Sequence, residues 1–450
     1  MSSPGSLLGD ETGGAGSADP AEAPIARHLL PFTAARAASG TLCVGGVDLV
    51  ELAASVGTPV FVYDEEHLRI KCREAVTSFG PGVAYGTKAF LCKAMASLAA
   101  EEGMWLDVST GGELAVALAA RVPPHRLVLH GNNKSEAELR AAVAAGVGRI
   151  VVDSFDEIAR LRALAAAGAI AAVGRPVQAL VRVTPGVEAH THEYVMTGQE
   201  DSKFGFSLAS GAAGSAVEAL RRIEGIRFAG VHTHVGSQIF RVDVYARAIA
   251  LLAPFLERHR VSELCIGGGL GVAYLNSEQA PSMAEWAATT RSACAEAGIS
   301  ATVRVTAEPG RSIVATAGMT LYRVGTVKVL GGLRTYVSVD GGMSDNPRPV
   351  LYGSGYEAFL PRAPAAARPL GVRLVGKHCE SGDVLVENAR LPSDLVVGDV
   401  VATPVTGAYG YAMASNYNRL GRPPVVFVAN GQARVVVRRE TIEDLLGLEP

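Results

Sequence analysis

The sequence lacks a substantial net charge, because 41 Lys and Arg residues nearly balance 44 Asp and Glu residues and leave a formal charge of −3. A protein with this balance has no overall positive field with which to hold nucleic acid or an anionic membrane. The sequence also lacks the run of about 18 apolar residues that a membrane helix needs, and the basic start of a signal peptide. We therefore expect a soluble protein that binds neither nucleic acid nor membrane and acts on a small molecule.

Cysteine is scarce, and no two cysteines form a CxxC pair. The six cysteines lie at positions 43, 72, 92, 265, 294 and 379. This spacing favours neither a zinc site nor a disulfide framework. Free thiols are typical of a reducing compartment, so we expect a cytoplasmic protein.

Between about residue 80 and residue 311, short β-branched runs alternate with Ala-, Leu-, Glu- and Arg-rich segments of helical period. The runs are VAYG (83–86), MWLDV (104–108), RLVLH (126–130), RIVVD (149–153), VQALVRV (177–183), IRFAGVHTH (226–234), ELCIG (263–267) and TVRVTAE (302–308). Eight strand–helix units predict a closed parallel (β/α)8 barrel, which we place at residues 61–313. An open doubly wound sheet is the alternative, because periodicity does not show whether a sheet closes.

After Arg311 the helical pattern stops, and runs such as TYVSVD, DVLVEN and PVVFVAN alternate apolar and polar residues between turn-forming residues. We expect residues 314–450 to form an antiparallel β domain. Residues 31–60 contain another β pattern, GTLCVGGVDL, and we expect them to join the same domain. Residues 1–30 begin with a stretch rich in Gly, Ser, Ala and Pro, which predicts a disordered tail.

Polar residues follow the predicted barrel strands, at the end where a (β/α) barrel has its active site. They are Lys88, Asp107, Ser109, His130, Asn132, Asp153, Arg182, His234, Glu308 and Arg311, together with glycines 267–269. Lys88 stands beside apolar residues, which would desolvate its amine, lower its pKa and make it nucleophilic enough to form a Schiff base. A lysine that extends its amine into solvent at a strand end is the alternative.

Two short motifs follow the seventh and eighth strands. CIGGGLG (265–271) places bare backbone amides where a late barrel strand commonly holds a phosphate, although a plain turn has the same composition. EPGR (308–311) supplies a carboxylate for a charged ring nitrogen and an arginine for an anion, with a surface ion pair as the alternative. Combined with a Schiff-base lysine, these motifs describe a pyridoxal phosphate site.

HTHVGSQ (232–238) carries histidines at i and i+2, which lie on one face of a strand. His234 could stack its ring on a flat cofactor, whereas His232 is better interpreted as a core histidine. A metal pair is the alternative. No HExxH motif or cysteine ligand accompanies the two histidines, so we expect no metal.

A series of motifs shows a family resemblance. They are YGTKAF (85–90), GELA (112–115), HGNNKS (130–135), SKFG (202–205), HTHVGSQ, GGGLG, EPGR, VDGGMSDNPRPVLYG (339–353), CESGD (379–383) and GAYGYAMASNYN (407–418). In these motifs and their order, the sequence resembles the diaminopimelate decarboxylases, which are fold-type III pyridoxal phosphate enzymes, from about residue 30 to its end. The resemblance implies a barrel of the alanine racemase type followed by an antiparallel β-barrel or sandwich domain.

The resemblance also implies roles for individual residues. Lys88 would hold pyridoxal 5'-phosphate covalently, His234 would stack on its ring, and Glu308 would bind the ring nitrogen. The implied cofactor-binding residues are Lys88, His234, Ser237, Gly268, Glu308, Pro309, Gly310, Arg311 and Tyr409. The implied substrate-binding residues are Arg311, Arg348 and Tyr352 for a distal carboxylate, Glu380 for a distal amine, and Tyr409. Cys379 would be the proton donor, and Lys88, Cys379 and His234 the catalytic residues.

The reaction implied by the resemblance is decarboxylation of meso-2,6-diaminopimelate to L-lysine, the last step of lysine biosynthesis. A decarboxylase for another amino acid is an alternative, but ornithine and arginine lack the distal carboxylate that Arg348 would bind. A catalytically silent cofactor-binding homologue is disfavoured by the presence of Lys88 and Cys379. A metal-dependent hydrolase that uses His232 and His234 is the remaining alternative. The resemblance further implies a homodimer in which Cys379 of one chain reaches Lys88 of the other.

Overall fold

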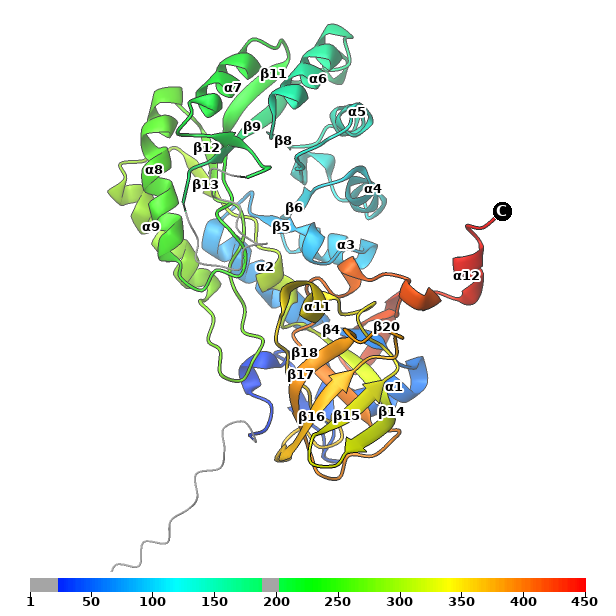
Figure 1. Ribbon diagram of the computed structural model, residues 1–450. Coiled ribbons are helices and arrows are strands. Elements are labelled where there is room, and N and C mark those ends of the chain that lie inside the picture. Colours follow the sequence, from blue (N-terminus) through cyan, green and yellow to red (C-terminus); the bar gives the residue numbers. More distant parts are fainter. Residues whose placement is uncertain (1–22, 188–201) are drawn as a thin grey trace, which may run out of the picture.

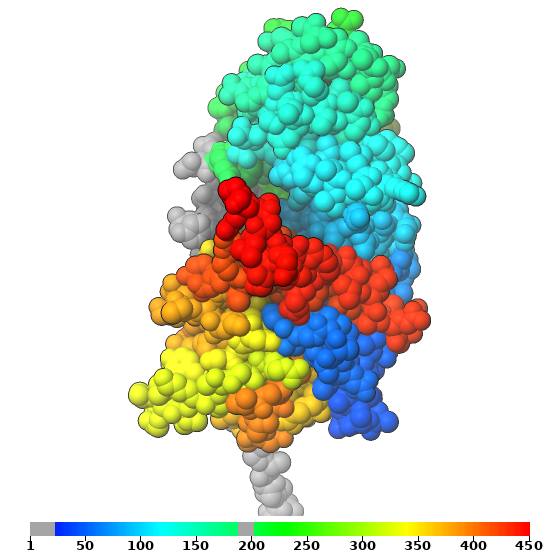
Figure 2. All heavy atoms as spheres, turned by 90° about the vertical axis from the view of Figure 1, so that its right-hand side faces the viewer, coloured from blue at the N-terminus to red at the C-terminus, as the bar shows by residue number. Residues whose placement is uncertain are grey.

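The structure, a computed structural model, describes residues 23–187 and 202–450. A barrel occupies the upper left of Figure 1, and a part rich in β-strands lies below it. The C-terminal residues, red in Figure 2, lie across the boundary between these two parts. Within the described ranges, no helix combines the length and the apolar character needed to cross a bilayer.

The barrel contains eight parallel strands, and each of the eight runs found in the sequence overlaps one of them. The strands are β5 (Ala84–Gly86), β6 (Trp105–Val108), β7 (Leu127–Leu129), β8 (Arg149–Val152), β9 (Val177–Thr184), β11 (Ile226–His232), β12 (Glu263–Cys265) and β13 (Arg304–Thr306), and β10 (Phe206–Ser207) pairs with β9. The helices that follow these strands are α3 (Lys93–Glu101), α4 (Gly111–Ala119), α5 (Glu136–Ala145), α6 (Phe155–Ala166), α7 (Ala212–Arg221), α8 (Asp243–His259), α9 (Met283–Glu296) and α10 (Arg311–Val314). The prediction of a (β/α)8 barrel is confirmed.

The barrel closes between its first and last strands. The Ala84 N–H donates to the carbonyl oxygen of Ala307, and the Gly86 N–H donates to that of Pro309, both at 3.0 Å. An open doubly wound sheet would leave these edge groups unpaired, so that alternative is wrong. On the outside of the barrel, where its first and last strands meet, α2 (Glu65–Phe79) packs against both α3 and α9.

The second part is built on a mixed β-sheet. Its strands are β4 (Val60–Asp64), β14 (Gly318–Leu330), β15 (Arg334–Val339), β16 (Leu370–Val375), β17 (Val384–Leu391), β18 (Val400–Pro404), β19 (Val425–Ala429) and β20 (Gln432–Val437), with the short helices α11 (Arg348–Tyr352) and α12 (Ile442–Leu446) between and after them. Most neighbouring strands are antiparallel, but β4 and β19 are parallel, as are β15 and β16. The expectation of a purely antiparallel domain is wrong for these two pairs, because no short hairpin joins their strands and forces them to be antiparallel.

The segment before the barrel joins the β part, but its boundary differs from the expected one. β4 ends at Asp64, so residues 61–64 belong to the mixed sheet and not to the barrel. The preceding residues form a small antiparallel sheet of β1 (Ala35–Arg36), β2 (Leu42–Val44) and β3 (Val47–Asp48), followed by α1 (Leu49–Val56). The Leu42 N–H attaches this small sheet to the β part by donating to the Pro361 carbonyl at 2.8 Å.

Part of the predicted tail is folded. Residues 1–22 lie outside the described residues. Further on, Leu29 is completely buried, and the Ala26 N–H donates to the side-chain oxygen of Asn276 at 2.9 Å. The prediction of a disordered tail is therefore wrong for residues 23–30, because apolar side chains in this segment enter the core.

Side-chain caps fix the starts of three barrel helices. Thr110 accepts a hydrogen bond from the Glu113 N–H, Ser154 accepts one from the Glu157 N–H, and Ser135 forms a capping box with Glu138. Each cap contributes about 0.5–2 kcal/mol of stability. These caps keep the strand–helix loops short, so the polar residues that follow β6, β7 and β8 stay at one end of the barrel.

Lys134 forms a buried ion pair at this end of the barrel. Its Nζ lies 2.9 Å from Glu157 Oε1, and the two side chains are only 2% and 1% exposed. The same amine donates to the carbonyl oxygens of Gly131 and Val151, both at 2.7 Å. The amine of Lys134 therefore links α6, β8 and the loop after β7.

We expect Lys134→Met to lower the free energy of unfolding by about 3–5 kcal/mol, because it leaves the Glu157 carboxylate buried without its cation. Denaturant-induced unfolding of the full chain measures this change. The matched control is Arg140→Met, which breaks an exposed pair with Glu136 and should cost less than about 1 kcal/mol. Equal losses in the two variants would contradict the role of Lys134.

Candidate active site

The polar residues of the site form one layer at the carboxyl ends of the barrel strands. Beneath this layer, the interior is filled by Ala84, Val128, Val151, Leu180, Ala229 and Cys265, with Trp105 packed against them. Because side chains alternate along a strand, the residue two positions further on faces the same interior. In β5 to β9 and β12 these next residues are Gly86, Asp107, His130, Asp153, Arg182 and Gly267. The polar side chains therefore meet at one end of the barrel, as expected from the sequence, because side chains alternate along each strand.

Two adjoining cavities open at this layer, with volumes of about 310 Å³ and 1020 Å³. The smaller cavity reaches Asp107 and Glu308, and the larger one reaches Arg348 and Tyr352. Both cavities are lined by Lys88, Phe204, His234, Ser237, Arg311 and Tyr409. Most residues assigned to the cofactor from the sequence thus surround one space, whereas Pro309 is buried behind it and lines neither cavity.

Lys88 lies in a short 3-10 turn, Thr87–Ala89, directly after β5. The Thr87 hydroxyl donates to the carbonyl oxygen of Asp107 at 2.6 Å and so attaches this turn to β6. Ala89 and Phe90 turn into the core, but Lys88 is exposed and faces both cavities. The expectation that apolar neighbours desolvate Lys88 is therefore wrong for the single chain, because its side chain is exposed. Of the three apolar neighbours, Ala89 and Phe90 are buried and Leu91 lines the larger cavity.

His234 is held by the glycine turn that follows β12. The Gly268 N–H donates to His234 Nδ1 at 3.1 Å. Burial, and then the charge of Lys88, lowers the pKa of His234 well below its usual value, so its ring is neutral at pH 7. A neutral imidazole facing the cavity can lie against a flat aromatic ring.

The backbone at Gly268 and Gly310 is too closely packed for a side chain. A Cβ atom on Gly268 would lie 2.3 Å from the Glu308 carbonyl oxygen, and one on Gly310 would lie 2.7 Å from the Gly86 carbonyl oxygen. Only glycine allows this approach, and it leaves open backbone at the wall of the smaller cavity.

Hydrogen-bond donors that can bind an anion lie at the same wall of the smaller cavity. Arg311 begins α10, and its Nη2 donates to Ser237 Oγ at 3.0 Å. The Arg311 guanidinium also lies 4.8 Å from the ring centre of Tyr409, whose own N–H donates to the Ala89 carbonyl oxygen at 2.8 Å. An arginine, a hydroxyl and bare glycine backbone are the groups that commonly bind a phosphate.

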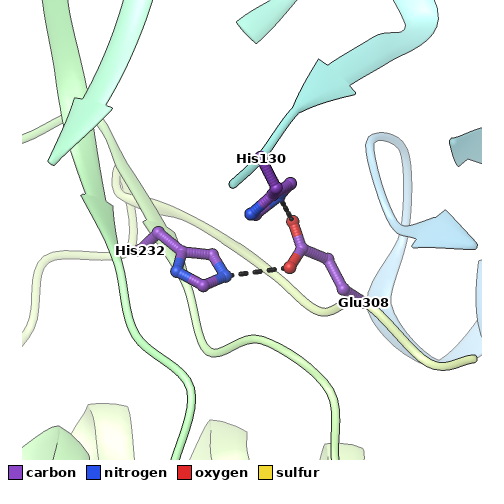
Figure 3. A group of neighbouring side chains, drawn as sticks. All are labelled: His130, His232 and Glu308. Atoms are coloured by element: carbon purple, nitrogen blue, oxygen red, sulfur yellow. Dashed lines mark hydrogen bonds and ion pairs between the residues drawn. The ribbon is translucent and has the colours of Figure 1, made fainter. Parts of the chain in front are cut away.

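Glu308 lies between two histidines from other strands (Figure 3). His130, directly after β7, has its Nε2 2.9 Å from Glu308 Oε1, and His232, the last residue of β11, has its Nε2 2.9 Å from Glu308 Oε2. Burial alone would raise the pKa of Glu308, but the two imidazoles hold it well below its usual range. Glu308 is therefore ionised. His232 is buried, as expected, but it also lines the smaller cavity.

The same three side chains are spaced closely enough to ligate an ion, because their ligand atoms lie within 4.8 Å of one another. The direct hydrogen bonds between Glu308 and the two histidines account for this spacing without an ion. The group includes His130 and not His234, so it is not the pair of His232 and His234 considered from the sequence.

Arg311 and Arg348 present positive charge to the larger cavity. Arg311 Nη1 donates to the Tyr274 hydroxyl at 2.7 Å, and the Arg348 guanidinium lies 4.4 Å from the centre of the same ring. Arg348 also donates to the Tyr356 hydroxyl at 2.6 Å. Within residues 23–187 and 202–450, neither arginine forms an ion pair with a carboxylate. Sequence reasoning missed Tyr274 and Tyr356, which lie outside the motifs.

Phe204, in the SKFG motif, is a third residue whose position at the site was not predicted from the sequence. It lines both cavities, and the guanidinium of Arg182 lies 4.2 Å from its ring centre. The next residue, Gly205, donates its N–H to Asp153 Oδ1 at 2.8 Å. Two residues of the polar layer therefore hold this segment against the site.

Cys379 and Glu380 are not brought to the site within one chain. Both are exposed, and neither lines the two cavities. The Cys379 N–H donates to Asn418 Oδ1 at 3.3 Å, and His378 Nδ1 lies 3.1 Å from the same oxygen. The loop is thus held in place, away from Lys88 of its own chain.

Comparisons with known proteins agree with this site. Residues 65–315 match the family described as pyridoxal-dependent decarboxylase, pyridoxal binding domain. The diaminopimelate decarboxylase of Mycobacterium tuberculosis is 48% identical, over 94% of this chain and 98% of its own length. That of Bacillus subtilis is 45% identical, over 91% and 95%.

This chain belongs to the diaminopimelate decarboxylase family. The fold agrees, because the crystal structure of diaminopimelate decarboxylase from M. jannaschii has a TM-score of 0.84 at 30% identity and covers 93% of this chain and 98% of its own. A lysine/ornithine decarboxylase from Vibrio vulnificus, crystallised with putrescine, has a TM-score of 0.72 at 25% identity and covers 85% and 98%. The resemblance noted in the sequence is confirmed.

Pyridoxal 5'-phosphate is the cofactor of this family, and the residues of this chain fit it. An exposed lysine faces the smaller cavity, close-packed glycines and an arginine stand at one wall, and an ionised carboxylate stands at another. These groups match an aldehyde, a phosphate and a protonated ring nitrogen respectively.

Proposed function

We propose that the protein decarboxylates meso-2,6-diaminopimelate to L-lysine and CO2, the last step of lysine biosynthesis. The observation that carries this proposal is the position of Arg311 and Arg348 in the cavity that also contains Lys88, without a carboxylate partner among the described residues. Burial would lower the pKa of Arg348, but the nearby Tyr356 and Tyr274 hydroxyls raise it above its usual value. A substrate with a second carboxylate supplies the missing anion. The free thiols of all six cysteines favour a cytoplasmic site for this reaction.

Different residues of the chain would bind different parts of the cofactor. Lys88 would attach it, His234 would contact its ring face, and Glu308 would keep its ring nitrogen protonated. Its phosphate would be held by Ser237, Gly268, Gly310 and Arg311, with Tyr409 at the edge of the cavity and Pro309 supporting the turn. When bound, the cofactor supplies a cationic ring that accepts the electron pair released with CO2.

The remaining residues would hold the substrate and supply a proton. Arg311, Arg348 and Tyr352 would bind the distal carboxylate, and Glu380 would bind the distal amine. The Cys379 thiol would then protonate the substrate α-carbon after CO2 has left. This order of events gives lysine as the product.

We further propose that two chains share each site, as a homodimer. Cys379 and Glu380 are exposed and lie outside the cavities of their own chain, so they are available to the cavity of a partner. A two-fold symmetric pairing would create two equivalent sites, each with Lys88 from one chain and Cys379 from the other.

We expect Arg348→Ala and Glu380→Ala each to lower kcat/KM for diaminopimelate by the equivalent of about 2–5 kcal/mol, because each leaves one substrate charge without its partner. Steady-state CO2 release measures this loss. The amount of bound cofactor, measured by its absorbance, should stay close to the wild-type value. Arg140→Ala, at an exposed helix position, is the matched control. Unchanged kcat/KM in both variants would contradict the proposed substrate.

A further inference from the structure

Four titratable side chains from separate strands meet at the inner wall of the smaller cavity. They are Asp107, His130, His232 and Glu308. His130 lies centrally, because its Nε2 is 2.9 Å from Glu308 Oε1 and 3.6 Å from Asp107 Oδ1. Asp107 Oδ1 accepts no hydrogen bond within the described part of the chain. His130 is therefore the basic side chain against which this oxygen lies.

The pKa values of the two histidines beside Glu308 are shifted in opposite directions. Burial alone would lower the pKa of His130, but the charges of Asp107 and Glu308 outweigh this effect and raise it. His232 has only Glu308 as an anionic neighbour, and burial lowers its pKa to about 4. His130 is therefore protonated more readily than a free histidine, whereas His232 is a neutral N–H donor at pH 7.

Other charged groups face this set from the surrounding elements. Lys88 after β5 and Arg182 of β9 contribute positive charge, and Glu113 of α4 contributes negative charge. Burial, together with Glu308 and Glu113, raises the pKa of Asp107 to about 7, although His130 and Lys88 oppose this. The group thus contains the ionised Glu308 and a second acid, Asp107, that is near its titration midpoint at neutral pH.

We propose that His130 is a positioning residue that keeps Glu308 ionised and in one orientation for the ring nitrogen of the cofactor, while His232 holds the second carboxylate oxygen as a neutral donor. The inference rests on the proposed function, since the ring nitrogen belongs to pyridoxal phosphate. The geometry supports it. Each oxygen of Glu308 is held by one imidazole at 2.9 Å, so the carboxylate is fixed in one orientation, and Asp107 Oδ1 lies 3.6 Å from His130 Nε2.

The test compares two ligands of the full-length apoprotein: pyridoxal phosphate and its 1-deaza analogue, in which a carbon replaces the ring nitrogen. Equilibrium binding to the wild type should favour pyridoxal phosphate by about 10- to 100-fold, because only this ligand forms a charged hydrogen bond with Glu308. His130→Gln keeps a donor but cannot take up a proton, and should reduce this preference at least fivefold. His232→Gln should reduce it about twofold, and exposed His28→Gln should leave it unchanged.

The ratio of affinities separates positioning from a structural role. A residue that only supports the fold would weaken binding of both ligands equally and leave the ratio at its wild-type value. An unchanged ratio in His130→Gln would therefore overturn the inference. Failure of the wild type itself to prefer pyridoxal phosphate would instead contradict the pairing of Glu308 with the ring nitrogen in the proposed function. In the loaded enzyme, His130→Gln should lower kcat more than it changes KM, because the cofactor and not the substrate is affected.

Discussion

Lys88→Ala protein should bind no cofactor that borohydride can trap, and its decarboxylase activity should fall by at least about 10²- to 10⁴-fold, the contribution of one well-placed catalytic group. Among the described residues that line the smaller cavity, Lys88 is the only lysine. Lys134 is no substitute, because its amine is buried against Glu157 and two carbonyl oxygens. No other amine of these residues faces Glu308 across this space.

The measurement is borohydride reduction of the loaded protein, followed by peptide mapping of the label. Lys203→Ala is the matched control, because Lys203 lines only the larger cavity and should not carry the label. A label on Lys203 or Lys134 in the wild type would contradict the assignment of Lys88 and of the strand that places it.

Mixing Lys88→Ala and Cys379→Ala proteins should restore activity that neither has alone. If each site takes its lysine from one chain and its thiol from the other, a mixed dimer has one intact site out of two. Random re-pairing of equal amounts then restores about a quarter of the wild-type activity. The position of Cys379, exposed and outside the cavities of its own chain, motivates this test.

The control mixture combines Lys88→Ala with His234→Ala. Both changes fall in the same barrel, so every site in that mixture is defective and no activity should return. Subunit exchange is verified separately with labelled chains. Absence of recovery in the first mixture, despite exchange, would refute the shared site.

The sequence predicts the barrel and its polar layer well, because both depend on local patterns. Strands with a period of two and helices with caps such as Ser135 can be recognised from short stretches of sequence. Lys88 could be placed after the first strand for the same reason. Its exposure could not be predicted, because that depends on the direction in which Ala89 and Phe90 turn.

Contacts between segments that are distant in the chain could not be predicted from the sequence. The hydrogen bonds of Glu308 to His130 and His232 arise only because the barrel closes and brings the ends of three strands together. The parallel pairing of β4 with β19 likewise joins segments separated by the whole barrel. Periodicity carries no information on such pairings, and so it also gave no signal for Tyr274 beside Arg348.

The most direct measurement of the central claim is CO2 release from a panel of amino acids at equal concentration. The panel contains meso-diaminopimelate, its L,L and D,D isomers, ornithine, arginine and lysine. Because Arg311 and Arg348 line the larger cavity and would bind a distal carboxylate, meso-diaminopimelate should be decarboxylated fastest, with L-lysine as the product. Ornithine, arginine and lysine should react at least about 10²-fold more slowly. Equal rates across the panel, or faster release from ornithine or arginine, would contradict the account.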